Sequence, residues 1–157
     1  MILAIDPGKT TGYAYQHGEA HGSGQLVLQD ALWGLLDALA PTVIVCERFD
    51  HRMVMGADLE AVEVIGILKE WSRQNRVEVH FQTQEQAKHF FTNARLKERG
   101  MDRPGLPHAR DAARHLLYWL TFGGGKPSGG RRPTARPQVP ETVTEPAKGS
   151  PSAREGE

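Results

Sequence analysis

Three short strand patterns at the start of the chain, separated by tight turns, restrict the possible folds more than any other feature of this sequence. They are ILAID at 2–6, TGYAYQ at 11–16 and SGQLVL at 23–28, and the turns between them contain Gly. Strands that follow one another this closely favour an antiparallel meander. The chain is therefore expected to begin with three antiparallel strands.

Strand and helix patterns alternate after the meander. Strands are predicted at 42–47 and 77–82, and helices, in chain order, at 30–40, 56–75, 83–96 and 108–120. The run TVIVCE at 42–47 is nearly all β-branched, which is typical of a strand buried on both faces. The order βββαβαβαα is that of the ribonuclease H-like fold, an α/β fold in which helices flank a mixed five-stranded sheet.

Each long helix pattern has an apolar stripe at helical spacing, which we expect to face the sheet. Asp30 is the candidate N-cap of the first helix. The stripe residues are Leu32, Leu35, Leu36 and Leu39 in the first helix; Ala61, Val64, Ile65, Leu68 and Trp71 in the second; and Ala109, Ala112, Ala113, Leu116, Leu117 and Leu120 in the last.

Gly and Pro are concentrated at the C-terminal end. The 35 residues at 123–157 hold 7 Gly and 6 Pro, and Val139 and Val143 are their only bulky aliphatic residues. Such a segment buries too little apolar surface to offset the entropy lost on ordering. We therefore predict one ribonuclease H-like folding unit at 1–122 and a disordered Pro/Gly-rich tail at 123–157.

The single cysteine, Cys46, excludes an intrachain disulfide, favours a reducing compartment and is expected to be a small buried residue. The sequence has no run of 18 apolar residues, and no basic region followed by a long apolar core at its start. These patterns argue against a membrane span and a secretory signal. The expected location is the cytoplasm.

The formal net charge of zero conceals an uneven distribution. Residues 1–83 carry 6 basic and 11 acidic side chains, whereas residues 84–114 carry 7 basic and 4 acidic ones. A local basic segment can contact phosphates even in a neutral chain. The alternative is a solvated helix surface with no ligand.

Two carboxylates close apolar strand patterns. Asp6 ends the first strand just before Pro7-Gly8, and Glu47 ends the run TVIVC. A carboxylate there lies at the C-terminal edge of the sheet, where turns leave space for a ligand. The alternatives are solvated acids at strand ends, or acids paired with Arg48 or Arg52.

The last helix supplies a third group of polar residues. His108, Asp111 and His115 lie at i, i+3 and i+7 and so share one helix face. If this helix crosses the sheet, His108 and Asp111 can meet Asp6 and Glu47, and three carboxylates with an imidazole suit a hard divalent cation. The alternative is surface decoration, with Asp111 paired to Arg114 or His115.

The segment GKT at 8–10 invites comparison with phosphate-binding loops. That motif requires Gly five positions before Gly8, and the residue there is Leu3, so the motif is absent. What remains is a turn that keeps side chains away from Asp6 and lets Lys9 and Thr10 approach a phosphate.

The motifs together resemble those of RuvC-type Holliday-junction resolvases. ILAIDPGKTTGYAY at 2–15 resembles their first motif, VIVCERF at 43–49 the second and HARDAARHLL at 108–117 the third. The segments at 65–71 and 86–100 resemble the family's second long helix and its Lys-bearing segment. The sequence departs from the cellular enzymes in a turn that is one residue shorter, in His108 where they have an acid, and in its short length with a Pro/Gly-rich tail. The histidine resembles the variant in RuvC-like proteins of bacteriophages and related elements, which implies a bacterial cell or a phage-infected host.

The resemblance implies a catalytic site that binds two Mg²⁺ or Mn²⁺ ions, with no small-molecule cofactor. In this interpretation Asp6 bridges both ions, Glu47 and Asp111 each bind mainly one, and His108 completes a coordination shell. Lys88 would contact the phosphate next to the cut. A nitrogen ligand in place of an oxygen would make Mn²⁺ at least as suitable as Mg²⁺.

The resemblance also implies contacts with branched DNA. Arg95, Lys97, Arg99 and Arg103 would follow the backbone, beside Lys9, Thr10 and Lys88. Phe49, followed by Arg52, would wedge between bases at the crossover, although this loop can equally cover the core. RuvC-like enzymes use the second long helix in a homodimer, which places two active sites for two symmetric cuts.

The function expected is therefore paired hydrolysis of four-way DNA junctions by a metal-dependent endonuclease. One alternative is a related nuclease, similar to YqgF-like proteins, that acts on flaps, forks or structured RNA. Another is a nucleic-acid-binding module without activity, which only the His108 replacement favours. A sugar-kinase or actin-like ATPase is excluded, because those proteins need two such domains.

Overall fold

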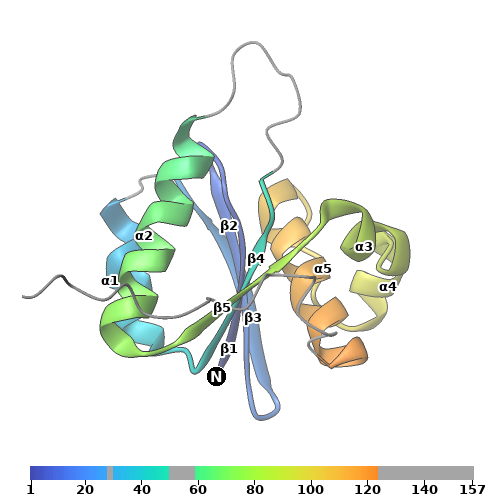
Figure 1. Cartoon of the computed structure of the whole chain (residues 1–157). Helices are drawn as coiled ribbons and strands as arrows, with labels where there is room; N and C mark the ends of the chain where they lie inside the picture. The colour runs from blue at the N-terminus through green and yellow to red at the C-terminus, as the bar shows by residue number, and fades with distance from the viewer. Residues whose placement is uncertain (28–29, 50–58, 124–157) are drawn as a thin grey trace, which may run out of the picture.

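The computed structural model describes residues 1–27, 30–49 and 59–123, and a five-stranded sheet lies at its centre (Figure 1). The elements in chain order are β1 (Ile2–Asp6), β2 (Thr11–His17), β3 (Ala20–Leu26), α1 (Asp30–Leu39), β4 (Val43–Glu47), α2 (Leu59–Asn75), β5 (Glu78–Gln82), α3 (Gln84–Phe90), α4 (Asn93–Glu98) and α5 (Pro107–Phe122). No helix among the described residues is long and apolar enough to cross a membrane.

The sheet has the strand order β3-β2-β1-β4-β5. Strand β1 pairs antiparallel with β2 and parallel with β4, while β3 continues the meander and β5 extends the parallel half. The predicted meander and the predicted mixed sheet are therefore both confirmed. Because β1, β4 and β5 are parallel, their carboxyl ends meet at one edge of the sheet.

Helices cover both faces of this sheet. Helices α1 and α2 lie on one face, and α3, α4 and α5 on the other (Figure 1). Alternate strand residues enter two separate cores: Ala4 and Val45 pack with α5, whereas Ile44 and Cys46 pack with α1 and α2. This alternation confirms that β4 is buried on both faces, because successive side chains of a strand point to opposite sides.

Most of the predicted helix stripes are buried. In α2, Ala61, Val64, Leu68 and Trp71 are buried and Ile65 is partly buried. In α5 the stripe is buried except for Leu120, which is 37% exposed, so that part of the prediction is wrong. At this end of α5 the contact with β5 is made by Trp119, whose ring centroid lies 4.4 Å from that of His80.

Two element boundaries also differ from the predictions. The helix expected at 83–96 is interrupted, because Phe91 leaves helical geometry to enter the core. The Thr92 side chain then accepts a hydrogen bond from Arg95 N at the start of α4. Strand β3 begins at Ala20 rather than at 23, since the turn at Gly18, with φ +59°, is tight enough to pair His17 with Ala20. The predictions for Arg52, residues 56–58 and the tail beyond 123 lie outside the described residues.

Candidate active site

Asp6 is the last residue of β1 and is only 7% exposed. The turn that follows is closed by the buried Thr11 hydroxyl, which donates to the Gly8 carbonyl oxygen at 3.0 Å. The strand partner of Asp6 is Gly12 on β2. The Asp6 carboxylate thus lies at the edge of the sheet, between a turn closed by a hydrogen bond and a strand partner, Gly12, that has no side chain.

The N-terminus of α5 lies against this same pair. The backbone N–H groups of His108 and Ala109 donate to Gln25 Oε1 at 3.0 and 3.5 Å, so β3 satisfies donors that the helix leaves unpaired. This docking brings His108 Nδ1 to 2.9 Å from Asp6 Oδ2. The expectation that α5 crosses the sheet close to Asp6 is therefore met.

Glu47 meets a different residue of α5. Its Oε2 lies 2.9 Å from Nε2 of His115, and the other ring nitrogen, Nδ1, lies 3.0 Å from Gln82 Oε1 at the end of β5. His115 is 1% exposed. The ion pairs of the described residues include this one and none between Glu47 and Arg48, while Arg52, the other alternative partner, lies outside those residues.

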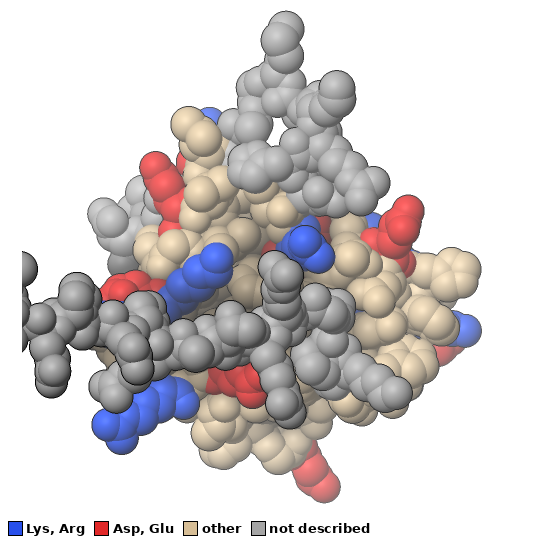
Figure 2. Space-filling model, viewed as in Figure 1, with Lys and Arg blue, Asp and Glu red and all other residues tan. Residues whose placement is uncertain are grey.

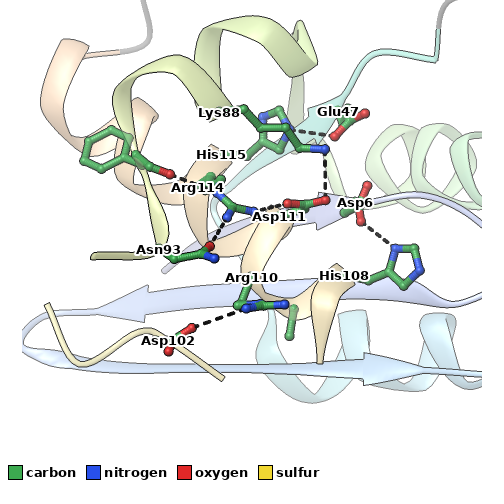
Figure 3. Close-up of polar contacts among 12 residues, drawn as sticks. Asp6, Glu47, Lys88, Asn93, Asp102, His108, Arg110, Asp111, Arg114 and His115 are labelled. Carbon is green, nitrogen blue, oxygen red and sulfur yellow. Dashed lines mark hydrogen bonds and ion pairs between the residues drawn. The ribbon is translucent and has the colours of Figure 1, made fainter. Parts of the chain in front are cut away.

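Asp111 lies between two basic side chains (Figure 3). Lys88 Nζ of α3 is 3.2 Å from Oδ2, and Arg114 contacts Oδ1 through Nη1. Arg114 also donates through Nε to the Phe91 carbonyl oxygen at 2.9 Å and through Nη2 to Asn93 Oδ1. Asp111 therefore has the Arg114 pairing that the sequence left open, together with a contact to Lys88.

The carboxylates of this cluster affect one another. The pKa of Asp6 is raised to about 6, first because burial disfavours the charged form and next because of repulsion from Glu47. The hydrogen bond from His108 acts in the opposite direction, and Asp111 raises the pKa further. Asp6 thus lies in the field of two other acids, where a cation would be stabilised.

Carboxylate oxygens and an imidazole nitrogen are ligands that suit a hard divalent cation, but these side chains are not arranged around a common point. Among the described residues, no three His, Cys, Asp or Glu side chains lie close enough together to hold a metal ion. The nitrogens of His108, His115 and Lys88 instead meet Asp6, Glu47 and Asp111. Asp6 Oδ1 and Glu47 Oε1 accept no hydrogen bond from the described residues and remain available as ligands.

The predicted DNA-contacting residues lie at several places around this cluster. Lys9 and Thr10 lie in the turn after Asp6, and Lys9 is exposed. Arg95, Lys97 and Arg99 are exposed in or just after α4, Arg103 is half-buried, and half-buried Phe49 follows β4 closely. On the uncovered parts of the face seen in Figure 2, basic and acidic side chains are interspersed.

Some of these basic residues also have structural contacts. Arg95 donates through Nη1 to the Phe90 carbonyl oxygen, and the Arg99 guanidinium lies 5.7 Å from the centre of the Phe91 ring. Arg52 lies outside the described residues. Lys88 is the predicted basic residue that contacts a carboxylate of the cluster.

Sequence reasoning assigned no role to three residues that complete the cluster. His115 was placed on the face of His108 and Asp111, but its contact with Glu47 was not anticipated. Gln82 was not singled out, and Arg114 was named only as a possible partner of Asp111. The available signal was a histidine at a helix position flanked by Ala112, Ala113, Leu116 and Leu117, where burial demands polar partners.

No protein-family model matches this sequence, and no curated protein matches it either. Solved structures do match. A complex of T. thermophilus RuvC with a Holliday junction substrate has a TM-score of 0.62 at 16% identity, covering 80% of this chain and 98% of that one. A second Thermus thermophilus RuvC structure has a TM-score of 0.53, with the same identity and coverage.

A complex of the fowlpox virus resolvase with substrate Holliday junction DNA has a TM-score of 0.51 at 13% identity, covering 77% of this chain and 97% of that one. At sequence identities this low, the similarity concerns the fold alone. The shared fold agrees with the order of elements expected from the sequence. The chain has the ribonuclease H-like fold that RuvC and this viral resolvase share.

Proposed function

We propose that this chain is a metal-dependent endonuclease that resolves four-way DNA junctions. One observation carries the proposal: helix α5 meets the acids that end two neighbouring strands. His108 of α5 lies 2.9 Å from Asp6 of β1 and His115 lies 2.9 Å from Glu47 of β4, and Asp111 lies between these two histidines on the same helix. The similar RuvC and fowlpox virus structures both hold Holliday junction DNA, which supports this choice of substrate.

In this proposal Asp6, Glu47, His108 and Asp111 hold two Mg²⁺ or Mn²⁺ ions. When bound, such ions activate water and stabilise the charge that develops at the phosphate. Asp6 and Glu47 each offer one oxygen that no described residue occupies, and His108 is 43% exposed, so it can turn from Asp6 toward an ion.

Lys88 contacts the phosphate next to the cut. Its side chain is 43% exposed and its ammonium group lies 3.2 Å from Asp111 Oδ2, so Lys88 can leave this carboxylate when a metal ion neutralises it. Arg114 remains on Asp111 and keeps it oriented through its further bonds to the backbone of Phe91 and to Asn93. Asp111 therefore keeps one fixed basic partner, Arg114, and has a second one, Lys88, that can move away.

The remaining contacts bind the DNA arms. Lys9 and Thr10 lie beside Asp6, and Arg95, Lys97, Arg99 and Arg103 extend the positive charge along the backbone, which makes affinity dependent on salt. Phe49 and Arg52 reach the crossover. A homodimer supplies the second site that paired cuts require.

The pairing of each carboxylate with an internal basic group or histidine favours one rival, a nucleic-acid-binding module that does not cut. The test uses labelled four-way junctions, flaps, forks, linear duplexes and structured RNA, incubated with Mg²⁺, Mn²⁺ or EDTA. Asp6→Asn and Asp111→Asn are compared with Glu70→Gln, a control on the exposed face of α2.

Metal-dependent paired cuts in the junction, lost in Asp6→Asn and Asp111→Asn and kept in Glu70→Gln, would support the proposal. Equal cutting of flaps, forks or RNA would replace it with a broader nuclease. Tight junction binding without cutting in either metal would replace it with the binding module.

A further inference from the structure

We infer that His115 is a positioning residue that, with Gln82, fixes the orientation of the Glu47 carboxylate and thereby sets the affinity of the site for its cation. This inference rests on the proposed function, since it concerns the same site. It adds a residue pair that the motifs of the sequence do not include.

The burial of His115 requires polar partners. The residue is 1% exposed on an α5 face whose neighbours Ala112 and Leu116 are fully buried. A polar ring in such surroundings is unfavourable unless its nitrogens are hydrogen-bonded. Both are, one to Glu47 Oε2 at 2.9 Å and one to Gln82 Oε1 at 3.0 Å.

The two contacts fix the ring at opposite ends. Glu47 and Gln82 are register partners at the ends of the parallel strands β4 and β5, and the imidazole bridges their side chains from α5. The Nε2–H group donates to Glu47, and the Gln82 amide can meet Nδ1 with its oxygen or its nitrogen. The bond to Glu47 therefore holds for either arrangement of the amide.

This bond divides the roles of the two Glu47 oxygens. Oε2 is held by His115, while Oε1 accepts no hydrogen bond from the described residues and is the atom left for a cation. The Glu47 side chain is 14% exposed, so one edge of it reaches solvent. Residues that hydrogen-bond a metal ligand in this way commonly change metal affinity by about 10–100-fold when they are replaced.

His115 itself is not placed to bind the ion. Both ring nitrogens are engaged and the side chain is 1% exposed. Among the described residues, His108 has a partner for one ring nitrogen, Nδ1, and its side chain is 43% exposed. The two histidines of α5 therefore have different roles: His108 is a candidate ligand, and His115 acts through Glu47.

The test measures Mn²⁺ binding to the full chain by electron paramagnetic resonance at one fixed pH. His115→Met removes the donor at similar volume, and His115→Gln keeps an amide donor near the place of Nε2. We expect Mn²⁺ affinity to fall about 10–100-fold in His115→Met and to be largely retained in His115→Gln. Leu117→Met, another buried position of α5, is the matched control and should leave affinity unchanged.

A double-mutant cycle separates positioning from general disturbance. In a Glu47→Gln background, His115→Met should lower Mn²⁺ affinity by less than about threefold, because the carboxylate through which it acts is gone. An equal loss in both backgrounds would overturn the inference, as would wild-type affinity in a folded His115→Met. If that variant does not fold, Gln82→Met replaces it and should lower Mn²⁺ affinity in the same direction; unchanged affinity there would overturn the inference.

The failure of the proposed function gives a different result. If the wild-type chain binds no Mn²⁺, the metal-dependent mechanism fails and this inference fails with it. If the wild type binds Mn²⁺ and the His115 variants bind it equally well, only the inference fails. In a cleavage assay, the defect of His115→Met should shrink as Mn²⁺ approaches saturation, a dependence that a purely structural defect would not show.

Discussion

A Cβ atom added to Gly12 would lie 2.0 Å from the carbonyl oxygen of His108. The backbone of β2 therefore touches the backbone of the first turn of α5, and no side chain fits between them. Gly12 is also the strand partner of Asp6. The absence of a side chain at this one position lets α5 approach until His108 reaches Asp6.

Gly12→Ala should consequently lower the free energy of unfolding by about 3 kcal/mol or more, because a backbone segment rather than a flexible side chain must move. The same shift should separate His108 from Asp6. Urea denaturation measures the first effect, and cleavage or Mn²⁺ binding the second.

Gly66→Ala is the matched control for this substitution. Gly66 lies inside α2, and a Cβ atom there meets nothing within 4 Å. The change should stabilise the protein by about 0.5–1 kcal/mol through helix propensity. Equal effects at positions 12 and 66 would show that the contact with His108 is unimportant.

Asp6→Asn should stabilise the metal-free protein above pH 6. The pKa of Asp6 is raised from 3.8 to about 6 by burial and then by Glu47, so the folded state holds the proton more tightly than the unfolded state. Stability therefore falls as pH rises from about 4 to 6, and the ionised group is unfavourable above that range. Removing the charge should contribute about 1–3 kcal/mol at pH 8.

The measurement is urea denaturation in EDTA at pH 8 and pH 4.5, and the advantage of Asp6→Asn should shrink at the lower pH. Glu70→Gln is the control, because Glu70 is exposed on α2 and its replacement should leave the free energy of unfolding nearly unchanged at both pH values. An Asp6→Asn protein that is less stable than wild type at pH 8 would contradict the prediction.

Arg114→Met should destabilise the fold by about 2–4 kcal/mol. The side chain is 13% exposed, and its loss leaves the Phe91 carbonyl and Asn93 without this donor and Asp111 with Lys88 as its remaining cation. Arg114→Lys should recover only part of this, since an ammonium group cannot reproduce the planar fork.

Arg73→Met on α2 tests whether this effect is specific to the buried guanidinium. Arg73 pairs with Glu70 on an exposed surface, so its replacement should leave the denaturation curve unchanged. A similar loss of stability in both variants would rule out the special role of Arg114.

Trp71→Phe should lower the free energy of unfolding by about 1–2 kcal/mol. Trp71 is 3% exposed, and its indole Nε1–H donates to Asp37 Oδ1 at 2.7 Å, which links α2 to α1. In a double-mutant cycle, Asp37→Ala should have a smaller effect once Trp71 is Phe. Additive effects would show that the hydrogen bond contributes nothing.

The order of elements and the ends of the strands could be predicted from the sequence, because they depend on local patterns. Burial of β4 on both faces requires only a continuous apolar run, and Asp6 and Glu47 end their strands by position in that run. The i, i+3, i+7 spacing likewise placed His108, Asp111 and His115 on one face of α5. One local prediction was wrong: the pattern indicates a continuous helix through Phe91, but burial of the Phe91 ring interrupts it.

The pairing of the polar side chains depended on the tertiary structure. His108 and Asp6 are 102 residues apart in the chain, and His115 and Glu47 are 68 apart. Which histidine meets which acid follows from how closely α5 approaches β2, and the backbone contact at Gly12 limits that distance. The sequence by itself determined which groups carry the chemistry and on which elements they lie. Only the packing of α5 on the sheet decided their partners, because hydrogen bonds form over about 3 Å and the position of a helix is fixed by every contact beneath it.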